Sequence, residues 1–209
     1  MIGQRLGAQE YIQRLNSEIA RCSPGDLTQL ADLVYDAWEA GKQVFVFGNG
    51  GHGTTASHIS EDLGKNLILP SDMLNETTRR LRVMSLSDNT GWITALGNDL
   101  AFDQIFVQQL MNFGAPGDLV IGISGSGNSA NVINALEWGN RHELATFALT
   151  GFDGGGVKAA ARYGLHVPLH DMEMVESIHL ALAHWVVDDV RARVNHLDRY
   201  ASARVTEQA

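Results

Sequence analysis

One stretch, residues 118–131, constrains the fold of this chain more than any other. It reads Asp-Leu-Val-Ile-Gly-Ile-Ser-Gly-Ser-Gly-Asn-Ser-Ala-Asn, and residues 119–123 within it are apolar or glycine, as is typical of a strand buried on both faces. Hydroxyls and glycines follow at once, and from Ala130 the apolar residues recur at helical spacing. A buried strand, a Gly/Ser loop and a helix in this order predict a strand–loop–helix unit of a parallel sheet.

The loop of this unit, residues 124–129, predicts an anion site. The free main-chain N–H groups and the positive dipole end of the helix start face the carboxyl edge of the strand. The hydroxyls of Ser124, Ser126 and Ser129 add donors that suit a phosphate monoester. Because the Lys and the Gly-Lys-Ser/Thr ending of a nucleotide-binding P-loop are missing, the loop favours a small phosphorylated ligand. The alternative is a turn that only caps the helix.

A second strand–glycine loop–helix unit surrounds Gly48-Asn49-Gly50-Gly51-His52-Gly53. Strands are expected over residues 43–47, 82–86, 119–123, 144–150 and 163–169, and helices over 8–21, 24–40, 56–63, 89–97, 102–112, 130–138 and 172–194. The polar, turn-prone residues 70–81 are expected to form a mobile excursion. Strands that alternate with helices predict a parallel sheet covered on both faces, with its ligand at the carboxyl ends of the strands. Both glycine loops fall there.

Composition limits the classes of function. The chain has 209 residues, 44% of them apolar, which suits one α/β domain with additional helices. A net charge of −9 argues against nucleic-acid binding, because clustered Lys and Arg hold phosphate backbones. The single cysteine, Cys22, excludes an internal disulfide and fits a reducing cytoplasm. Since no apolar run reaches the ~18 residues of a membrane span, we expect a cytoplasmic protein that binds neither membrane nor nucleic acid.

Several segments together resemble the sugar isomerase (SIS) domain family and, within it, the phosphoheptose isomerases. The matching segments are residues 48–51, 58–62, 97–99, 102, 105–106, 124–131, 149–151, 153–155 and 178–184. The resemblance covers roughly residues 8–194 and implies a flavodoxin-like three-layer α/β sandwich with a five-stranded parallel sheet, plus an N-terminal helical pair. It also implies a homotetramer with active sites at the subunit contacts. We accordingly expect residues 1–40 to be N-terminal helices of the oligomer core, 41–197 the SIS domain and 198–209 a flexible tail.

The resemblance also implies roles for individual side chains. The expected contacts of a phosphorylated sugar are Asn49, Gly50, Gly51, His52, Asp99, Ser124, Ser126, Ser129 and Glu176. The expected catalytic pair is Asp62 and His184. In zinc-containing relatives the positions of His58, Asp62, Glu176 and His184 hold the metal, which implies one Zn²⁺ per subunit.

Three positions depart from the family pattern: His52 replaces a Ser, Glu176 a Gln, and Asp62 a catalytic Glu. Aspartate is one methylene shorter than glutamate, so a base at position 62 sits about 1.5 Å further back unless the helix shifts. A misplacement of ~1 Å costs on the order of 10²-fold in rate. Asp62 therefore serves a metal, or a substrate of different shape, better than it serves a heptose.

The residues themselves also indicate a metal site. His58 and Asp62 are four residues apart on a helix and share one face, which suits a divalent ion, zinc above all. The alternative is a hydrogen-bonded pair facing solvent. Glu176 and His184 are eight residues apart, ~12 Å of helix rise, so both reach one ion only if Glu176 lies in or before the first turn. Otherwise His179 replaces Glu176 as a ligand or substrate contact, unless it is an ordinary core histidine.

The first functional hypothesis is a ketose–aldose isomerase that converts sedoheptulose 7-phosphate to D-glycero-D-manno-heptose 7-phosphate through an enediol. This reaction needs a base, an acid and stabilisation of an oxyanion, roles that suit Asp62, His184 and a bound zinc. Two alternatives remain. One is an isomerase of another sugar phosphate. The other is a non-catalytic tetrameric adaptor resembling the SIS relatives that bind the replication initiator protein.

Overall fold

Five parallel strands form one sheet in the order β2-β1-β3-β4-β5 in the computed structural model, which describes residues 3–198. The strands are β1 (Gln43–Gly48), β2 (Arg82–Ser85), β3 (Leu119–Ser124), β4 (Ala145–Thr150) and β5 (Tyr163–His166). Every residue of the central strand, β3, is buried, as its unbroken apolar sequence predicts for a strand covered on both faces. The expected α/β fold with a five-stranded parallel sheet is confirmed.

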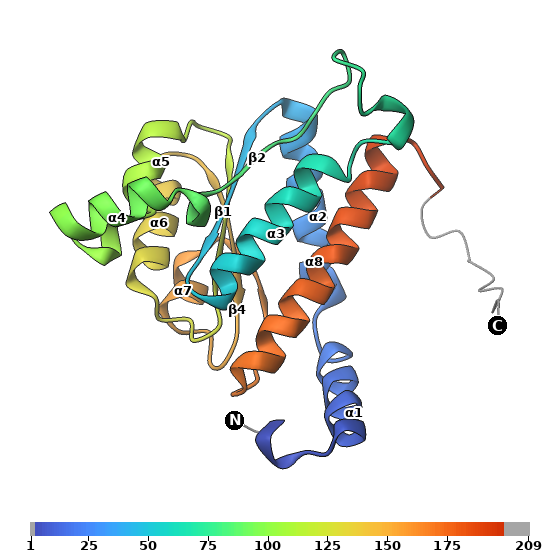
Figure 1. The fold of residues 1–209 in the computed structure, drawn as a ribbon, viewed down its shortest axis with the longest axis vertical. Helices are drawn as coiled ribbons and strands as arrows, with labels where there is room; N and C mark the ends of the chain where they lie inside the picture. Colours follow the sequence, from blue (N-terminus) through green and yellow to red (C-terminus); the bar gives the residue numbers. More distant parts are fainter. Residues whose placement is uncertain (1–2, 199–209) are drawn as a thin grey trace.

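Helices cover both faces of the sheet, so the molecule has three layers (Figure 1). One face carries α2 (Pro24–Ala40), α3 (Gly51–Lys65) and α8 (Met172–Val194), and the other carries α5 (Val107–Phe113), α6 (Ala130–Arg141) and α7 (Gly155–Ala160). The alternation of side chains along β1 supplies both cores. Val44 and Val46 pack into the first, whereas Phe45 and Phe47 pack into the second. Two further helices, α1 (Ala8–Ile19) and α4 (Thr90–Asp99), lie at the outside of these layers (Figure 1).

The two N-terminal helices differ in how they are covered. The hydroxyl of Ser23 accepts a hydrogen bond from the Asp26 N–H, which caps the start of α2, and α2 ends at Gly41 in the left-handed conformation. Leu30 and Val34 of α2 are buried in the first of the two cores, against α3, α8 and one face of the sheet. By contrast, α1 packs on the first half of α8. The division at residue 40 and the place of both helices in an oligomer stay predictions.

Some boundaries differ from the sequence expectation. The fifth strand ends at His166 rather than residue 169, because its partner β4 ends at Thr150, opposite His166, and Pro168 has no N–H to donate. The helix expected over 102–112 is a 3-10 turn followed by α5, because the Asp103 carbonyl oxygen accepts a hydrogen bond from the Asn134 side chain and not from the next turn of a helix. The short helix α7 has no counterpart in the expectation.

Two further expectations concern irregular segments. Between residues 70 and 81 the chain contains only one short 3-10 turn, Pro70–Asp72, and the mobility expected for this excursion stays a prediction. Of the expected flexible tail, residues 199–209 lie outside the described part of the chain. No helix within residues 3–198 has the length and apolar character that crossing a membrane requires.

Candidate functional site

The two glycine loops meet at the carboxyl edge of the sheet and line a cavity of about 290 Å³. Its walls contain Asn49, Gly50, Gly51, His52, Ile123, Ser124, Gly125, Ser126, Ser129, Met172 and Glu176. Every expected substrate contact is therefore brought together here except Asp99. The sequence showed no signal for Met172, which enters the wall because α8 begins beside the loop.

The serine loop owes its shape to β3, α6 and one glycine. Gly127 has φ +72°, and a Cβ there would lie 2.2 Å from the Gly154 carbonyl oxygen, so only glycine lets the serine loop approach the turn between β4 and α7. The hydroxyls of Ser124 and Ser129 lie 3.0 Å apart, and Ser129 stands immediately before the first turn of α6. Hydroxyl donors thus gather at the positive end of a 12-residue helix, an arrangement that suits a phosphate group.

A pair of amides joins the two loops. Asn49 and Asn131 exchange two hydrogen bonds of 2.9 Å, with each side chain acting as donor and acceptor once. Asn131 is buried at the start of α6, so its amide is fixed by the helix that carries the serine loop. The Asn49 side chain is therefore oriented at the cavity wall before any ligand arrives.

His52 and Glu176 stand side by side in the cavity wall. His52 Nδ1 lies 3.8 Å from Glu176 Oε1, and the imidazole is only 4% exposed. Burial lowers the pKa of His52 to about 4, so the ring is neutral at physiological pH. Burial, and to a lesser degree the neighbouring Glu173, raises the pKa of the Glu176 carboxyl. A Cβ at Gly51 would lie 2.4 Å from both Glu176 carboxylate oxygens, so the missing side chain makes room for that carboxylate.

Three other predicted side chains form a separate cluster where α3 and α8 pack together (Figure 1). Asp62 Oδ2 lies 3.4 Å from His58 Nε2 and 3.4 Å from His184 Nε2, and the two histidine nitrogens are 3.5 Å apart. The other carboxylate oxygen, Oδ1, accepts a hydrogen bond of 2.7 Å from the Asn66 amide, which fixes the orientation of Asp62. Both imidazoles are about half exposed, so the cluster is open to solvent.

The spacing of this cluster fits a zinc ion. In a tetrahedral site with metal–ligand bonds of about 2.0–2.1 Å, neighbouring ligand atoms lie roughly 3.3–3.4 Å apart. The three separations in the cluster, 3.4, 3.4 and 3.5 Å, lie close to that edge length. Two imidazoles and one carboxylate also leave a fourth position open, as catalytic zinc sites do.

Two predicted residues lie apart from the groups to which the resemblance assigned them. Glu176 sits beside Gly51 and His52, in the second turn of α8, and is not among the three residues of the metal cluster. Asp99 is exposed at the end of α4, where its carboxylate accepts a hydrogen bond from Asn98, and it lines neither cavity at this edge of the sheet.

A second cavity of about 290 Å³ adjoins the first and shares Asn49 and Gly50 with it. Its polar wall includes Ser57, whose hydroxyl bonds to the Asp88 carboxylate. Sequence reasoning missed this cavity. A signal was available in the group of polar residues that directly follows β2, at the same carboxyl edge as the glycine loops.

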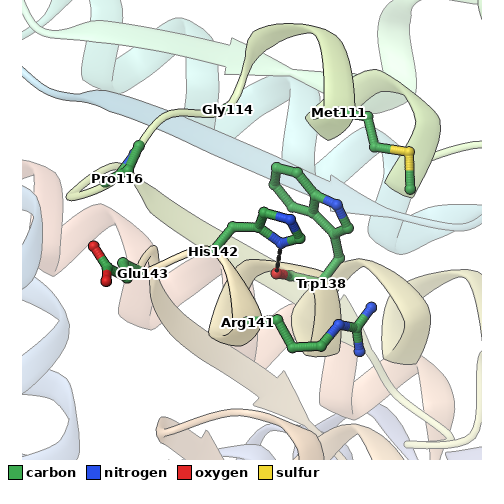
Figure 2. Close-up of a pocket in the computed structure, with 7 residues that line it drawn as sticks. All are labelled: Met111, Gly114, Pro116, Trp138, Arg141, His142 and Glu143. Atoms are coloured by element: carbon green, nitrogen blue, oxygen red, sulfur yellow. Dashed lines mark hydrogen bonds between the residues drawn. The ribbon is translucent and has the colours of Figure 1, made fainter.

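A wider hollow, about 800 Å³, lies at the opposite edge of the sheet, where the chain enters β3 and β4 (Figure 2). Figure 2 shows the His142 ring stacked on Trp138, with Arg141 beside them. The centroids of the two stacked rings are 4.1 Å apart. None of the predicted site residues lines this hollow, so its size does not mark it as the functional site.

Comparison with known proteins identifies the family to which the chain is similar. The SIS domain family model matches residues 9–151. The phosphoheptose isomerase of Chlorobaculum tepidum is 33% identical over 189 residues, which cover 89% of this chain and 87% of that protein. The phosphoheptose isomerase of Geobacter sp. strain M21 is 36% identical over 180 residues, or 84% of this chain and 90% of that protein. Among solved structures, phosphoheptose isomerase GmhA from Neisseria gonorrhoeae superimposes with a TM-score of 0.79 at 28% identity, covering 92% of this chain and all of that chain.

Proposed function

The chain belongs to the SIS domain family, and we propose that it is an aldose–ketose isomerase that converts sedoheptulose 7-phosphate to D-glycero-D-manno-heptose 7-phosphate. Two phosphoheptose isomerases align with it over more than four fifths of its length, at 33% and 36% identity, which supports this reaction. Two features of its own residues also support it: a serine loop suited to a phosphate and a separate cluster of titratable side chains.

The separation of these two features is the observation that carries the proposal. His52 lies against the serine loop, since a Cβ at Gly125 would be 2.7 Å from the His52 ring. His58 follows six residues later on α3, an axial rise of ~9 Å. An extended seven-carbon chain, with bonds of about 1.5 Å, spans roughly 8 Å. The rise between His52 and His58 is thus comparable to the length of a heptose chain, which supports a phosphate at the serine loop and reacting carbons at the cluster.

We assign the residues of the chain as follows. The serine hydroxyls and the start of α6 bind the phosphate, and Asn49, His52 and Glu176 contact the sugar hydroxyls. Asp62 and His184 move the proton between the two adjacent carbons of the substrate, as base and acid. His58, Asp62 and His184 would also hold a zinc ion, which supplies Lewis-acid polarisation of a carbonyl oxygen when bound.

We propose further that the active unit is a cytoplasmic homotetramer. Several large apolar side chains are exposed in the single chain, among them Ile12 at 59% and Phe102 at 59%, which an assembly would cover. Asp99 lines neither cavity of its own chain, so its predicted sugar contact requires a neighbouring subunit or a movement of α4. Light scattering tests the assembly, and a monodisperse monomer would rule it out.

Kinetics of point variants test the assigned chemistry. His184→Ala should abolish turnover of sedoheptulose 7-phosphate, and Asp62→Glu, which restores the longer side chain, should preserve or improve it. Asp188→Ala is the matched control, because Asp188 is exposed on the same helix. Turnover that survives His184→Ala would contradict the assignment, and absence of turnover in the unmodified chain would favour the adaptor.

A further inference from the structure

Behind the cavity wall lies a buried histidine for which the proposed reaction gives no role. His179, in the third turn of α8, is fully buried, and both of its ring nitrogens have polar neighbours. Nε2 lies 3.3 Å from the Thr150 carbonyl oxygen, at the end of β4, and Nδ1 lies 3.2 Å from His52 Nε2. A chain of contacts therefore runs from the sheet, through His179, to His52 in the cavity wall.

The direction of these hydrogen bonds follows from the carbonyl. An oxygen of a peptide group only accepts, so His179 Nε2 must carry the proton and donate it to Thr150. In a neutral ring Nδ1 then has only a lone pair and accepts from His52 Nε2–H. In the opposite tautomer, the lone pair of His179 Nε2 would face the carbonyl oxygen at 3.3 Å, acceptor against acceptor.

The consequence appears at the other side of His52. With its proton on Nε2, the neutral ring has an unshared pair on Nδ1, the nitrogen that lies 3.8 Å from Glu176. Burial lowers the pKa of His179 to about 3 and that of His52 to about 4, so both rings are neutral at physiological pH. Each ring therefore carries its single proton on Nε2.

We propose that His179 is a positioning residue, which fixes the ring and tautomer of His52 so that Nδ1 accepts a hydrogen bond from a hydroxyl group of the bound sugar phosphate. This inference rests on the proposed function, because it needs a polyhydroxylated ligand in the cavity of the serine loop. Without His179, the His52 ring is free to turn and to place its proton on either nitrogen. In the molecules whose His52 carries its proton on Nδ1, a sugar hydroxyl that would donate to Nδ1 meets an N–H group instead of a lone pair.

Two substitutions at position 179 separate this role from simple packing. The amide oxygen of Asn takes the position of Nδ1, so His179→Asn keeps an acceptor for His52. The longer side chain of Gln reaches the position of Nε2, so His179→Gln keeps the donor to Thr150 and loses the acceptor. Both are uncharged amides, and a residue needed only to fill the core would not distinguish them by the atom they present.

The test measures dissociation constants of sedoheptulose 7-phosphate and of inorganic phosphate by calorimetry for the unmodified chain and both variants. The Gln variant should bind the sugar phosphate about tenfold more weakly than the unmodified chain, the scale of one hydrogen bond, and the Asn variant should be closer to the unmodified chain. Inorganic phosphate should bind all three alike. Equal losses in both variants would overturn the role of His179, whereas an unmodified chain that binds neither ligand would contradict the proposed function itself.

A second measurement needs no folded variant at position 179. The ¹⁵N NMR shifts of His52 in the unmodified chain, assigned by their disappearance in His52→Gln, report which ring nitrogen carries the proton. We expect a protonated Nε2 and an unprotonated Nδ1 at neutral pH. A neutral ring with its proton on Nδ1, or a mixture of both tautomers, would overturn the inference.

Discussion

Removal of hydroxyls from the serine loop should weaken binding of a phosphorylated sugar by an amount that the structure lets us rank. One hydrogen bond to a charged phosphate contributes about 1.5–3 kcal/mol, or roughly 10–150-fold in the dissociation constant. The hydroxyl of Ser129 already pairs with that of Ser124 at 3.0 Å, so Ser129→Ala frees Ser124 to turn towards the ligand. Ser126→Ala has no such compensation, because the Ser126 hydroxyl pairs with the main-chain N–H of Asn128, at 3.4 Å, and not with another hydroxyl. Ser126→Ala should therefore cost more.

The assay is calorimetry with two ligands, sedoheptulose 7-phosphate and sedoheptulose. The Ser126→Ala and Ser129→Ala variants should lose affinity for the phosphate ester and bind the unphosphorylated sugar as the unmodified chain does. The double variant should lose more than either single one but less than their sum, since the hydroxyls serve one ligand group. Ser17→Ala, on the exposed side of α1, is the control and should change neither value. Equal losses for both sugars would show that the loop does not hold the phosphate.

Three further predictions concern stability, metal and the cavity wall. Burial lowers the pKa of His179 from 6.5 to about 3, so only the unfolded chain gains a proton there as the pH falls below about 6.5. Between pH 7 and pH 4 the free energy of unfolding, measured by urea titration, should therefore fall by about 3 kcal/mol more in the unmodified chain than in His179→Asn. Equal losses in the two proteins would refute this. Elemental analysis of protein purified without chelator should find one divalent ion per chain, and Asp62→Asn should lose it; a metal-free unmodified chain would contradict the cluster. Gly51→Ala places a Cβ 2.4 Å from the Glu176 oxygens and should raise KM, whereas Gly91→Ala, where a Cβ meets open space, should not. Equal KM values would exclude the carboxylate from sugar binding.

Much of the fold could be predicted because local patterns and tertiary demands agree. The apolar run 119–123 is the central strand, and Ser23-Pro24 with Gly41 delimits α2 as capping rules require. The end of the fifth strand could not be read locally, because it depends on where the neighbouring strand stops at Thr150. A strand boundary of this kind is a property of the pairing and not of the segment.

The candidate site likewise contains some contacts that local sequence patterns predict and others that depend on how distant segments pack. The serine loop is continuous in sequence, and the spacing of His58 and Asp62 puts both on one face of a helix, so their proximity followed from helix geometry. The sequence indicates the separation of Glu176 from the cluster only through the ~12 Å of helix rise between Glu176 and His184. The contact between His52 and His179, which are 127 residues apart, depends on how α3 and α8 pack, and no local pattern carries that information.

The most direct test of the central claim is NMR of the purified, unmodified chain incubated with sedoheptulose 7-phosphate, with and without added zinc. The account predicts that signals of an aldose, D-glycero-D-manno-heptose 7-phosphate, grow as those of the ketose decline, and that unphosphorylated sedoheptulose is unchanged under the same conditions. A ketose spectrum that stays constant in both metal conditions would contradict the claim that this SIS domain protein is a sugar-phosphate isomerase acting on the heptose.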